Sequence, residues 1–460
     1  MLQGMSPSLD RLAFRLFRAR IPLLLFLLLA LSVLGSGEAQ SHRDRPNFLI
    51  LFIDDMGYGD LGCFGGTSAR TPHIDKLAEE GTRFTSFYAQ TVCGPSRGAL
   101  MTGRYPFRVG GGWTTNSEEV TIAEILKATG YATGCVGKWD MSKRRYLEHL
   151  VPNAQGFDEY FGPLGANDGN SVTLYRNREK LEATNEMAAL TRLYTDESIA
   201  FLKKHRDGPF FLYLAHTMMH VVIDASPEFR HRTGKGLYAD TLEELDYEIG
   251  RLLTALDDLG LKDNTVVLFT SDNGPWSNDK ERQHAKNAKY VEWSQGPELP
   301  WGSAGPLRGA KGSTWEGGVR VPGILRWPGH VPAGHTSDAI VSTLDVLPTF
   351  AGLGGGDSLI PDDRVIDGVD QRALFLGESQ EGRRDGFLYF EGDELQAIRK
   401  GPWKLRLPGL KKLRNWPELD RGSQETELYH LINDIGETKN VAAAHPEVVQ
   451  RLLSESQAFN

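Results

Sequence analysis

The sequence predicts an α/β protein with a large sheet flanked by helices, followed by a small antiparallel sheet with a terminal helix. Three observations favour this class. Apolar, strand-like runs alternate with amphipathic helical segments up to about residue 384. Beyond that point, short alternating strands replace them. The length of 460 residues exceeds what one hydrophobic core usually serves, which indicates one large domain and a smaller one.

In the large domain, short apolar runs predict strands and capping residues predict helices. The predicted strands are Asn47 to Ile53, Tyr131 to Gly137, Phe210 to Ala215 and Val266 to Thr270. The predicted helices are Thr71 to Gly81, Thr121 to Thr129 and Thr241 to Leu259. Thr121 and Glu124 have the spacing of a capping box, which supports the second helix. The stretch from Pro275 to about Gly312 lacks periodicity, and a connection of that length is more often functional than idle.

The C-terminal region has the pattern of a small antiparallel sheet. Its predicted strands and final helix are Phe387–Phe390, Leu395–Arg399, Trp403–Leu407, Glu427–Leu431 and Pro446–Leu453. We therefore divide the chain into a leader (1–39), a main domain (40–384) and a small C-terminal α+β subdomain (385–460).

The first 39 residues have the features of a signal peptide. Arginines at positions 11, 15, 18 and 20 precede the apolar run from Ile21 to Leu31. Gly37 and Ala39 then fit a cleavage site before Gln40. The alternative is an uncleaved membrane anchor, but the run is short for a span, so we expect no stable anchor. This leader predicts export to the periplasm or the medium.

Charge and cysteine content limit the function further. The net charge of −9 is unfavourable for non-specific binding of nucleic acid, so no nucleic-acid partner is expected. Only Cys63, Cys93 and Cys135 are present. An odd number cannot all pair, so an exported chain keeps at least one thiol that needs an explanation.

Several polar side chains come directly after predicted strands. They are Asp54, Asp55, Lys138, His220, Asp272 and Asn273. Open α/β sheets place their sites at the carboxyl ends of the strands, so these groups are expected in one crevice. Three carboxylates and an amide offer only oxygen, which favours Ca²⁺ or Mg²⁺ over Zn²⁺. Taken singly, each pair would more often be a turn or a cap.

The segment from Cys93 to Arg104 decides between these alternatives. Pro95 is predicted to open a helix, which places Cys93 at that helix's positive end. A lone cysteine is usually a buried inert thiol. Here, however, the segment resembles the sulfatase signature, with matches at Cys93, Pro95, Ser96, Arg97, Leu100, Thr102, Gly103 and Arg104. In the sulfatase family a maturation enzyme oxidises this cysteine to formylglycine, whose aldehyde hydrates to a gem-diol.

The resemblance covers nearly the whole chain after the leader. Asp54 to Gly66 and Ser271 to Gly274 are similar to the family's metal-binding stretches, and Leu307 to Arg320 is similar to its late lysine motif. Gly401 to Leu405 and Glu427 to Leu431 resemble its C-terminal sheet. The implied fold is an alkaline-phosphatase-like sandwich with a large mixed central sheet, and residues 40–384 would form the catalytic domain.

The resemblance also implies roles for individual residues. Asp54, Asp55, Asp272, Asn273 and the modified Cys93 would hold the cation. One hydroxyl of the gem-diol attacks sulfur, and the second allows sulfate to be ejected, which a plain cysteine could not do. Arg97, Lys138 and Lys311 would neutralise the sulfuryl oxygens, and His220 would protonate the leaving oxygen. His216 is the alternative acid.

One departure from the family concerns the third strand. The family usually has Gly-Lys-Trp-His-Leu-Gly there, whereas this chain has Gly137-Lys-Trp-Asp-Met-Ser142. Asp140 therefore replaces the histidine that contacts the diol. It is a working base, a sign of altered substrate preference, or a cause of impaired activity. A second departure comes after His220, where the family often has a proline and this chain has Val221-Val-Ile-Asp-Ala-Ser-Pro227.

The implied function is hydrolysis of sulfate esters, with a sulfated glycan as substrate and a formylglycine-generating maturase as partner. Two alternatives are a phosphonate or phosphodiester hydrolase of the same fold and a catalytically impaired glycan-binding protein. Aromatic and basic residues that could hold a sulfated sugar are Trp276, Lys280, Arg282, Lys286, Lys289, Tyr290, Trp293 and Trp301, with Lys143 to Arg145 as a second anion contact. Packing and solvent-exposed charge explain them equally well. Pairing of Cys63 with Cys135 stays open.

Overall fold

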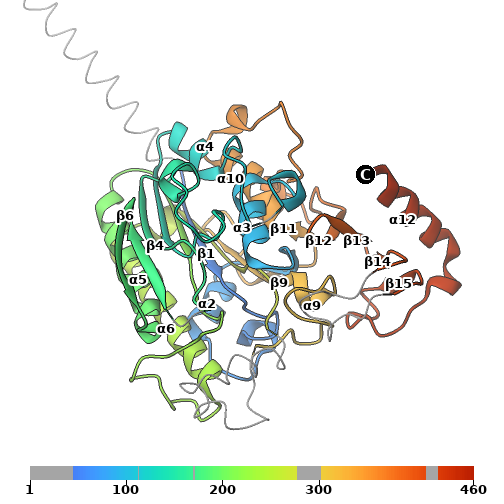
Figure 1. Cartoon of the computed structure of the whole chain (residues 1–460), viewed down its shortest axis with the longest axis horizontal. Helices are drawn as coiled ribbons and strands as arrows, with labels where there is room; N and C mark the ends of the chain where they lie inside the picture. The colour runs from blue at the N-terminus through green and yellow to red at the C-terminus, as the bar shows by residue number, and fades with distance from the viewer. Residues whose placement is uncertain (1–44, 112, 169–170, 277–301, 411–422, 460) are drawn as a thin grey trace, which may run out of the picture. The chain divides into compact units, whose positions relative to one another are not determined.

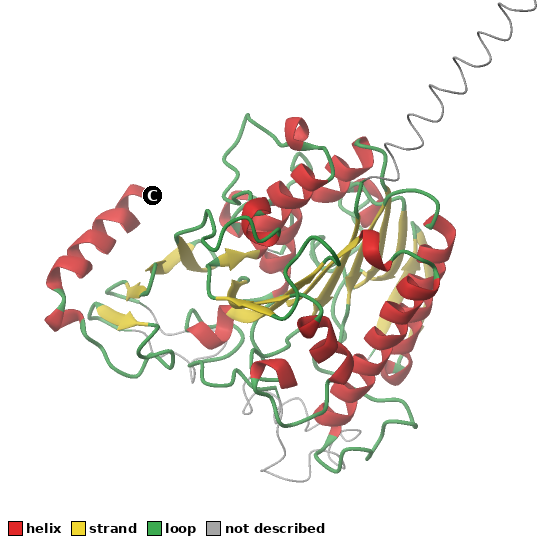
Figure 2. Ribbon diagram, turned by 180° about the vertical axis from the view of Figure 1, so that it is seen from behind, coloured by secondary structure: helices red, strands yellow, loops and turns green. Residues whose placement is uncertain are grey.

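The computed structural model describes residues 45–111, 113–168, 171–276, 302–410 and 423–459. Residues 46–460 contain a large mixed sheet with helices on both of its faces. A smaller sheet carries the C-terminal helix (Figure 1; Figure 2). This is the α/β class predicted from the sequence. The predicted leader lies outside the described residues.

The large sheet has eleven strands in the order β10-β2-β9-β8-β1-β7-β3-β4-β5-β6, with β11 paired to β2. Their bounds are β1 Asn47–Ile53, β2 Thr82–Tyr88, β3 Ala132–Gly137, β4 Glu159–Pro163, β5 Val172–Arg176, β6 Glu179–Thr184, β7 Phe210–Ala215, β8 Thr265–Ser271, β9 Arg320–Arg326, β10 His335–Ser337 and β11 Val341–Ser342. The four neighbours β8, β1, β7 and β3 run parallel. Their carboxyl ends therefore meet at one edge.

Two hydrophobic cores lie against the two faces of the large sheet. One face is covered by α2 (Pro72–Glu79), α5 (Met187–His205) and α6 (Leu237–Asp258). The other is covered by α3 (Cys93–Thr102), α4 (Ile122–Ala128), α10 (Val346–Leu353) and α11 (Arg372–Phe375). The central strand β1 is buried along its whole length, because it contributes alternate side chains to both cores. The sheet is thus a rigid platform for the residues at the ends of its strands.

The small sheet is antiparallel, in the order β12-β13-β14-β15. Its elements are β12 Gly386–Glu391, β13 Glu394–Lys400, β14 Trp403–Arg406, β15 Glu427–His430 and the helix α12 Pro446–Phe459. A buried carboxylate joins it to the main body. Glu316, in the short helix α9 (Glu316–Val319), accepts hydrogen bonds from Tyr88 on β2, Tyr389 on β12 and Lys404 on β14.

The predicted strands agree with the structure to within one residue in the large domain, and the capping box of Thr121 and Glu124 is confirmed. Several helix boundaries differ, and the last helix, predicted over Pro446–Leu453, continues to Phe459. The helix predicted to start at Thr241 begins at Leu237 instead. The helix predicted between Thr71 and Gly81 spans Pro72–Glu79 with Thr71 at the N-cap position, but the Thr71 side chain accepts from the backbone amide of Gly62 and does not cap the helix. Finally, α3 begins at Cys93 itself and not at Pro95.

The cysteines are unpaired in the structure. Cys135 belongs to the core on the α3–α4 face of the sheet, whereas Cys63 packs against the core on the opposite face. A disulfide between them is therefore excluded by the sheet that separates them.

Candidate active site

The ends of three parallel strands bring most of the predicted polar residues together. Asp54 and Asp55 come after β1, Lys138 after β3, and Asp272 and Asn273 after β8. Backbone hydrogen bonds continue between the strands past their ends: the amide of Asp272 donates to Ile53 at 3.0 Å, and that of Lys138 donates to Ala215 at 2.7 Å. The site residues are therefore held by the sheet itself.

The carboxylates of Asp54, Asp55 and Asp272 form a buried acidic cluster with Cys93. One atom from each residue lies within 4.8 Å of those of the others. Asp55 has a φ of 59°, in the left-handed region that non-glycine residues rarely adopt. Its amide donates to Asp272 Oδ1 at 3.1 Å, which holds the turn in place. Such strain is typical of functional sites.

Asn273 completes the cluster with an amide. Its Nδ2 atom donates to Asp55 Oδ1 at 2.7 Å and to the Gly274 carbonyl at 2.8 Å. Its Oδ1 atom is buried and has no hydrogen-bond partner among the residues that the structure describes. A buried amide oxygen without a donor is costly unless a ligand satisfies it. Together with the three carboxylates, it makes a set of oxygen donors suited to a hard cation.

Cys93 occupies the first position of α3 and is fully buried. Its thiol donates to Asp54 Oδ1 at 3.2 Å, and Lys311 Nζ lies 3.2 Å from Sγ. Burial first, and then the charge of Asp54, raise the pKa of the thiol well above its usual value. A reactive cysteine needs the opposite shift. The unmodified side chain is therefore a poor nucleophile despite its position at a helix N-terminus.

Three buried cations balance the three carboxylates. Lys138 Nζ donates to Asp54 Oδ2 at 2.7 Å, and Lys311 Nζ donates to the two carboxylate oxygens of Asp55 at 2.6 and 2.8 Å. Burial lowers the pKa of each lysine, but the neighbouring negative charges outweigh it and the net shift is upward, so both stay charged. The third cation is Arg97.

Arg97 lies four residues after Cys93 in α3, and its Nη2 atom is 2.8 Å from Asp272 Oδ2 and 3.7 Å from Asp54 Oδ2. Its guanidinium donates to Asp272 Oδ2 at 2.8 Å and to the Lys138 carbonyl at 2.9 Å. The predicted contact of Arg97 with a sulfuryl oxygen stays a prediction. What the structure gives is an ion pair that orients Asp272.

Burial of several carboxylates together shifts their pKa values apart. Burial raises the pKa of Asp272 to about 8, and the charge of Asp54 adds to the shift. Burial also raises the pKa of Asp55. For Asp54 the cations, with Lys138 foremost, outweigh burial and hold the pKa well below its usual value. A bound cation would favour the charged form of both carboxyl groups and so offset the effects of burial and of mutual repulsion.

His220 reaches the cluster, whereas His216 does not make contact with it. His220 Nε2 lies 3.8 Å from Asp55 Oδ2 and 3.6 Å from Asp168 Oδ1, and Nδ1 contacts the Val221 carbonyl. His216 Nδ1 instead accepts from the Met218 amide, and its ring packs against Tyr194. Burial is the main cause that lowers the pKa of both imidazoles.

Asp140 lies just past β3, has a φ of 57° and is fully buried. Its carboxylate lies 3.3 Å from Lys138 Nζ and accepts from Arg144 Nε at 2.9 Å. The negative charge that this residue brings to the site is thus neutralised on both sides. Arg144 also donates to Asp168 Oδ2 at 2.6 Å.

The comparisons with known proteins agree with this geometry. The Sulfatase family model matches residues 46–356. The chain belongs to the sulfatase family. It is 37% identical over 414 residues to N-acetylgalactosamine-6-sulfatase of Canis lupus familiaris, covering 82% of this chain and 74% of the relative. It is 35% identical over 459 residues to arylsulfatase A of Homo sapiens, covering 88% and 86%. The chain is therefore a sulfuric ester hydrolase.

Solved sulfatase structures share the fold. A crystal structure of Ps i-CgsB in complex with k-i-k-neocarrahexaose superposes with a TM-score of 0.74 at 28% sequence identity, covering 90% of this chain and 93% of that one. The expected α/β architecture, with a large mixed central sheet and a separate small antiparallel sheet, is confirmed.

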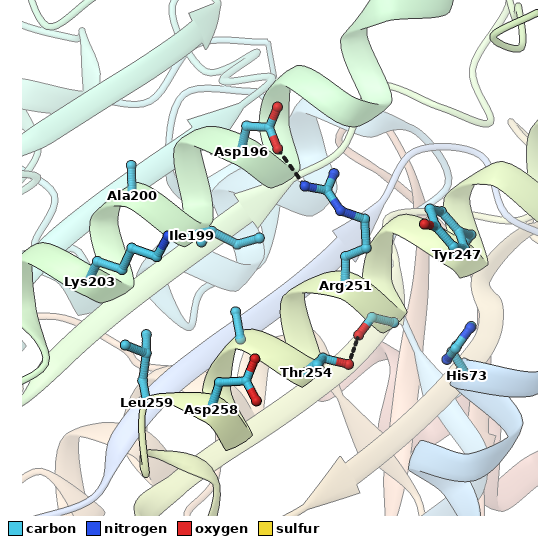
Figure 3. A pocket seen from close by; sticks show the side chains of 12 residues that line it. His73, Asp196, Ile199, Ala200, Lys203, Tyr247, Arg251, Thr254, Asp258 and Leu259 are labelled. Atoms are coloured by element: carbon cyan, nitrogen blue, oxygen red, sulfur yellow. Dashed lines mark hydrogen bonds and ion pairs between the residues drawn. The ribbon is translucent and has the colours of Figure 1, made fainter.

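A large groove in the sulfatase lies away from this cluster. It has a volume of about 760 Å³ between α5 and α6, near His73 (Figure 3). Its most prominent cation, Arg251, is neutralised by Asp196 at 2.8 Å and Glu248 at 2.6 Å. None of the predicted site residues lines it. The groove therefore offers no arrangement comparable to the cluster around Cys93.

One residue near the site of the sulfatase, Asp168, was not singled out from the sequence, and some predicted residues lie outside the described part of the chain. Asp168 stands in the sequence Asn-Asp-Gly, whose composition predicts only a loop. Arg144 was predicted only as one of three neighbouring basic residues, Lys143 to Arg145, that could contact an anion. Trp276 is buried against the ring of His220 and lies 4.7 Å from Lys311 Nζ, so it forms part of the site wall. The remaining aromatic and basic residues of the long loop, 280–301, lie outside the described residues.

Proposed function

We propose that this sulfatase is an exported enzyme that hydrolyses sulfate esters of carbohydrates through a formylglycine made from Cys93. The observation that carries the proposal is the position of Cys93. Its Sγ atom lies 3.2 Å from Asp54 Oδ1 and 3.2 Å from Lys311 Nζ, at the first residue of a helix. A nucleophile formed there would face a cation site on one side and a lysine on the other.

The acidic cluster fits a Ca²⁺ ion, with Mg²⁺ as the alternative. Asp54, Asp55, Asp272 and the unsatisfied Oδ1 of Asn273 would hold it, with the modified Cys93 as a further ligand. When bound, the cation supplies positive charge that binds a sulfate oxygen and activates the nucleophile. When the three carboxylates are ionised around the bound ion, they balance the three basic side chains, and the ion leaves a net positive charge that suits an anionic ester.

Formylglycine supplies what the thiol lacks. Its hydrate has one hydroxyl to attack sulfur and a second whose proton loss lets sulfate leave. Cys93 is fully buried in the folded chain, so a maturase must oxidise it before folding is complete. Co-production with a formylglycine-generating enzyme is therefore needed, because treatment of the folded protein would not reach the thiol.

The two lysines are placed to bind the ester. Lys138 and Lys311 each donate to a carboxylate of the cluster while lying beside Cys93 or Asp54. A sulfuryl group bound in front of Cys93 would accept hydrogen bonds from them, which would stabilise the charge that develops as the ester bond breaks. Arg97 would act through Asp272, which it orients.

His220 is the proposed acid for the leaving alcohol. In the free protein its imidazole is neutral and Nδ1 faces a carbonyl, so Nε2 must gain a proton before it can donate one. Asp55 and Asp168 face Nε2 and would stabilise the protonated form. Asp140 is the proposed base for the step that releases sulfate.

The substrate class is inferred from relatives and the leader. The similar proteins include an enzyme for sulfated N-acetylgalactosamine and a structure in complex with neocarrahexaose. The apolar leader 1–39 favours export and a polymer or oligosaccharide outside the cytoplasm. No helix among the described residues is long and apolar enough to cross a membrane.

The proposal is tested by sulfate release. Protein co-produced with a formylglycine-generating enzyme would be assayed on a panel of sulfated glycans and an aryl sulfate, with peptide mass spectrometry to measure conversion of Cys93. Release that disappears in Cys93→Ala supports the proposal. Failure of fully converted protein on every member of the panel contradicts it, and matched phosphonate esters would then be assayed.

A further inference from the structure

The loop after β3 is folded so that one basic side chain turns toward the site. Asp140, Lys143 and Arg144 have φ values of 57°, 53° and 56°, all in the left-handed region. The Lys143 amide donates to the Trp113 carbonyl at 2.9 Å, and Ser142 pairs with Thr114 in an isolated β-bridge. Three left-handed non-glycine residues within five positions are costly and persist only where surrounding contacts impose them.

Arg144 links the buried site to the solvent. Its Nε atom donates to Asp140 Oδ1 at 2.9 Å inside the protein, and Nη1 donates to Asp168 Oδ2 at 2.6 Å nearer the surface. Its guanidinium carbon lies 5.1 Å from the ring centre of Trp113. The side chain of Arg144 is 35% exposed and that of Asp168 is 39% exposed. The position is therefore open to a ligand while its inner end is anchored.

We propose that Arg144 is a specificity-determining residue that binds a second anionic group of the substrate, a carboxylate or another sulfate, next to the ester that is hydrolysed. This inference rests on the proposed function. A guanidinium has five N–H donors in a fork that matches a carboxylate or sulfate. The half-exposed ion pair with Asp168 is weak and can be exchanged for a substrate anion, while Asp140 keeps the guanidinium in place.

Neutralisation of Asp140 alone does not account for this arrangement. Only Nε and Nη2 of Arg144 face that carboxylate, whereas Nη1 reaches outward to Asp168 Oδ2 at 2.6 Å. The neighbours Lys143 and Arg145 are exposed and make no side-chain ion pair or hydrogen bond with any described residue. Of the three basic residues, only Arg144 is directed at the site. The ring of Trp113, 42% exposed, provides a flat apolar surface beside it for a sugar.

The test compares matched substrates that differ by one anionic group. The first pair is 4-methylumbelliferyl sulfate and the 7-sulfate of 7-hydroxycoumarin-4-acetic acid, which adds a carboxylate. The second pair is N-acetylgalactosamine 6-sulfate and its 4,6-disulfate, which adds a sulfate. Converted wild-type enzyme, Arg144→Gln, Arg144→Lys and the control Arg145→Gln would be measured on all four.

We expect Arg144→Gln to lower kcat/KM for the doubly anionic member of at least one pair by at least about tenfold more than for its partner, mainly through KM. The substrate pair for which Arg144→Gln loses the wild-type preference shows whether Arg144 binds a carboxylate or a second sulfate. Arg144→Lys keeps the charge without the fork, so an intermediate loss is expected, and this variant serves if Arg144→Gln does not fold. Arg145→Gln should keep the wild-type selectivity.

Equal losses on both members of both pairs would overturn the inference and leave Arg144 as a support for Asp140. That result leaves the proposed function intact, because sulfate is still released by the wild type. Absence of release from all four substrates by converted wild-type enzyme would instead overturn the proposed function, and this inference with it.

Discussion

Lys311 Nζ lies 3.2 Å from Cys93 Sγ, although 218 residues separate the two in the chain. The same ammonium donates to both oxygens of Asp55. One cation thus touches the proposed nucleophile and a proposed metal ligand. The Nζ atom of Lys311 therefore connects the late lysine motif to the segments that contain Cys93 and Asp55.

This contact predicts that Lys311→Met lowers kcat by about 10²–10³-fold, since a preorganised donor to the developing charge is lost in a water-excluded site. Conversion of Cys93 and the thermal unfolding temperature would be measured alongside, so that a folding defect is recognised. Lys203→Met, which changes an exposed lysine on α5, is the matched control. A kcat within twofold of wild type in Lys311→Met would remove this residue from the mechanism.

A cation in the acidic cluster should stabilise the fold. Asp54, Asp55 and Asp272 are buried within 4.8 Å of one another, so a ligand that binds only the folded state adds about 2.7 kcal/mol at one hundred times its Kd. We expect excess Ca²⁺ to raise the unfolding temperature by several degrees over protein in EDTA. The increase should be lost in Asp272→Asn. The same unfolding temperature with and without Ca²⁺ in the wild type would argue against the cation site.

The parts of the site that were predicted from the sequence depend on local signals. Apolar runs that stop at Ile53 and Thr270 indicate strand ends, and parallel strands bring the residues after their carboxyl ends to one edge of the sheet. Asp54, Asp55, Asp272 and Asn273 therefore gather as expected. Their role as metal ligands stays a prediction.

Other features depend on long-range packing and leave little local trace. Strand β9 inserts antiparallel between β2 and β8, and no property of its own residues selects those neighbours. Strand β6 alternates only Leu181 and Ala183 with polar residues, and of these two Leu181 packs against a core, so its local signal is weak. Arg144 and Asp168 meet across 24 residues of chain, so their pairing could not be inferred from either segment alone.

The buried carboxylate of Glu316 predicts a defined pH dependence of stability. Burial works to raise its pKa, but Lys404, Arg320 and Arg399 outweigh it and lower the pKa to about 2. A carboxyl whose pKa is lower in the folded state than in the unfolded chain stabilises the fold above the unfolded value of 4.5. That stabilisation is lost progressively as the pH falls from about 4.5 toward 2.

Glu316→Gln should therefore lose roughly 3–5 kcal/mol of stability at pH 7, because the substitution removes a negative charge that pairs with the buried Lys404. Below pH 4.5 the difference between wild type and variant should shrink. Urea unfolding at pH 7, 4.5 and 3.5 would measure both effects. Glu447→Gln, at an exposed position on α12, is the control. A difference that stays constant over this pH range would show that the pKa of Glu316 is not lowered in the folded protein.

Asp140 is the residue at which the chemistry is most open to test. It is buried, lies 3.3 Å from Lys138 and 2.9 Å from Arg144, and replaces the histidine expected at this position. If it is the base that accepts a proton during sulfate release, Asp140→Asn lowers kcat by about 10²–10⁴-fold. Asparagine adopts left-handed φ values as readily as aspartate, so this substitution keeps the backbone and removes only the charge.

Asp140→His distinguishes the role of Asp140 as a proton acceptor from the role of its negative charge. An imidazole can accept the proton but cannot neutralise Lys138 and Arg144, so partial recovery relative to Asp140→Asn would identify proton transfer as the lost step. Equal loss in both variants would instead indicate that the negative charge is what matters, through the position of Arg144. Rates that match wild type in both variants would exclude Asp140 as the base, because neither the proton acceptor nor the charge would then limit turnover.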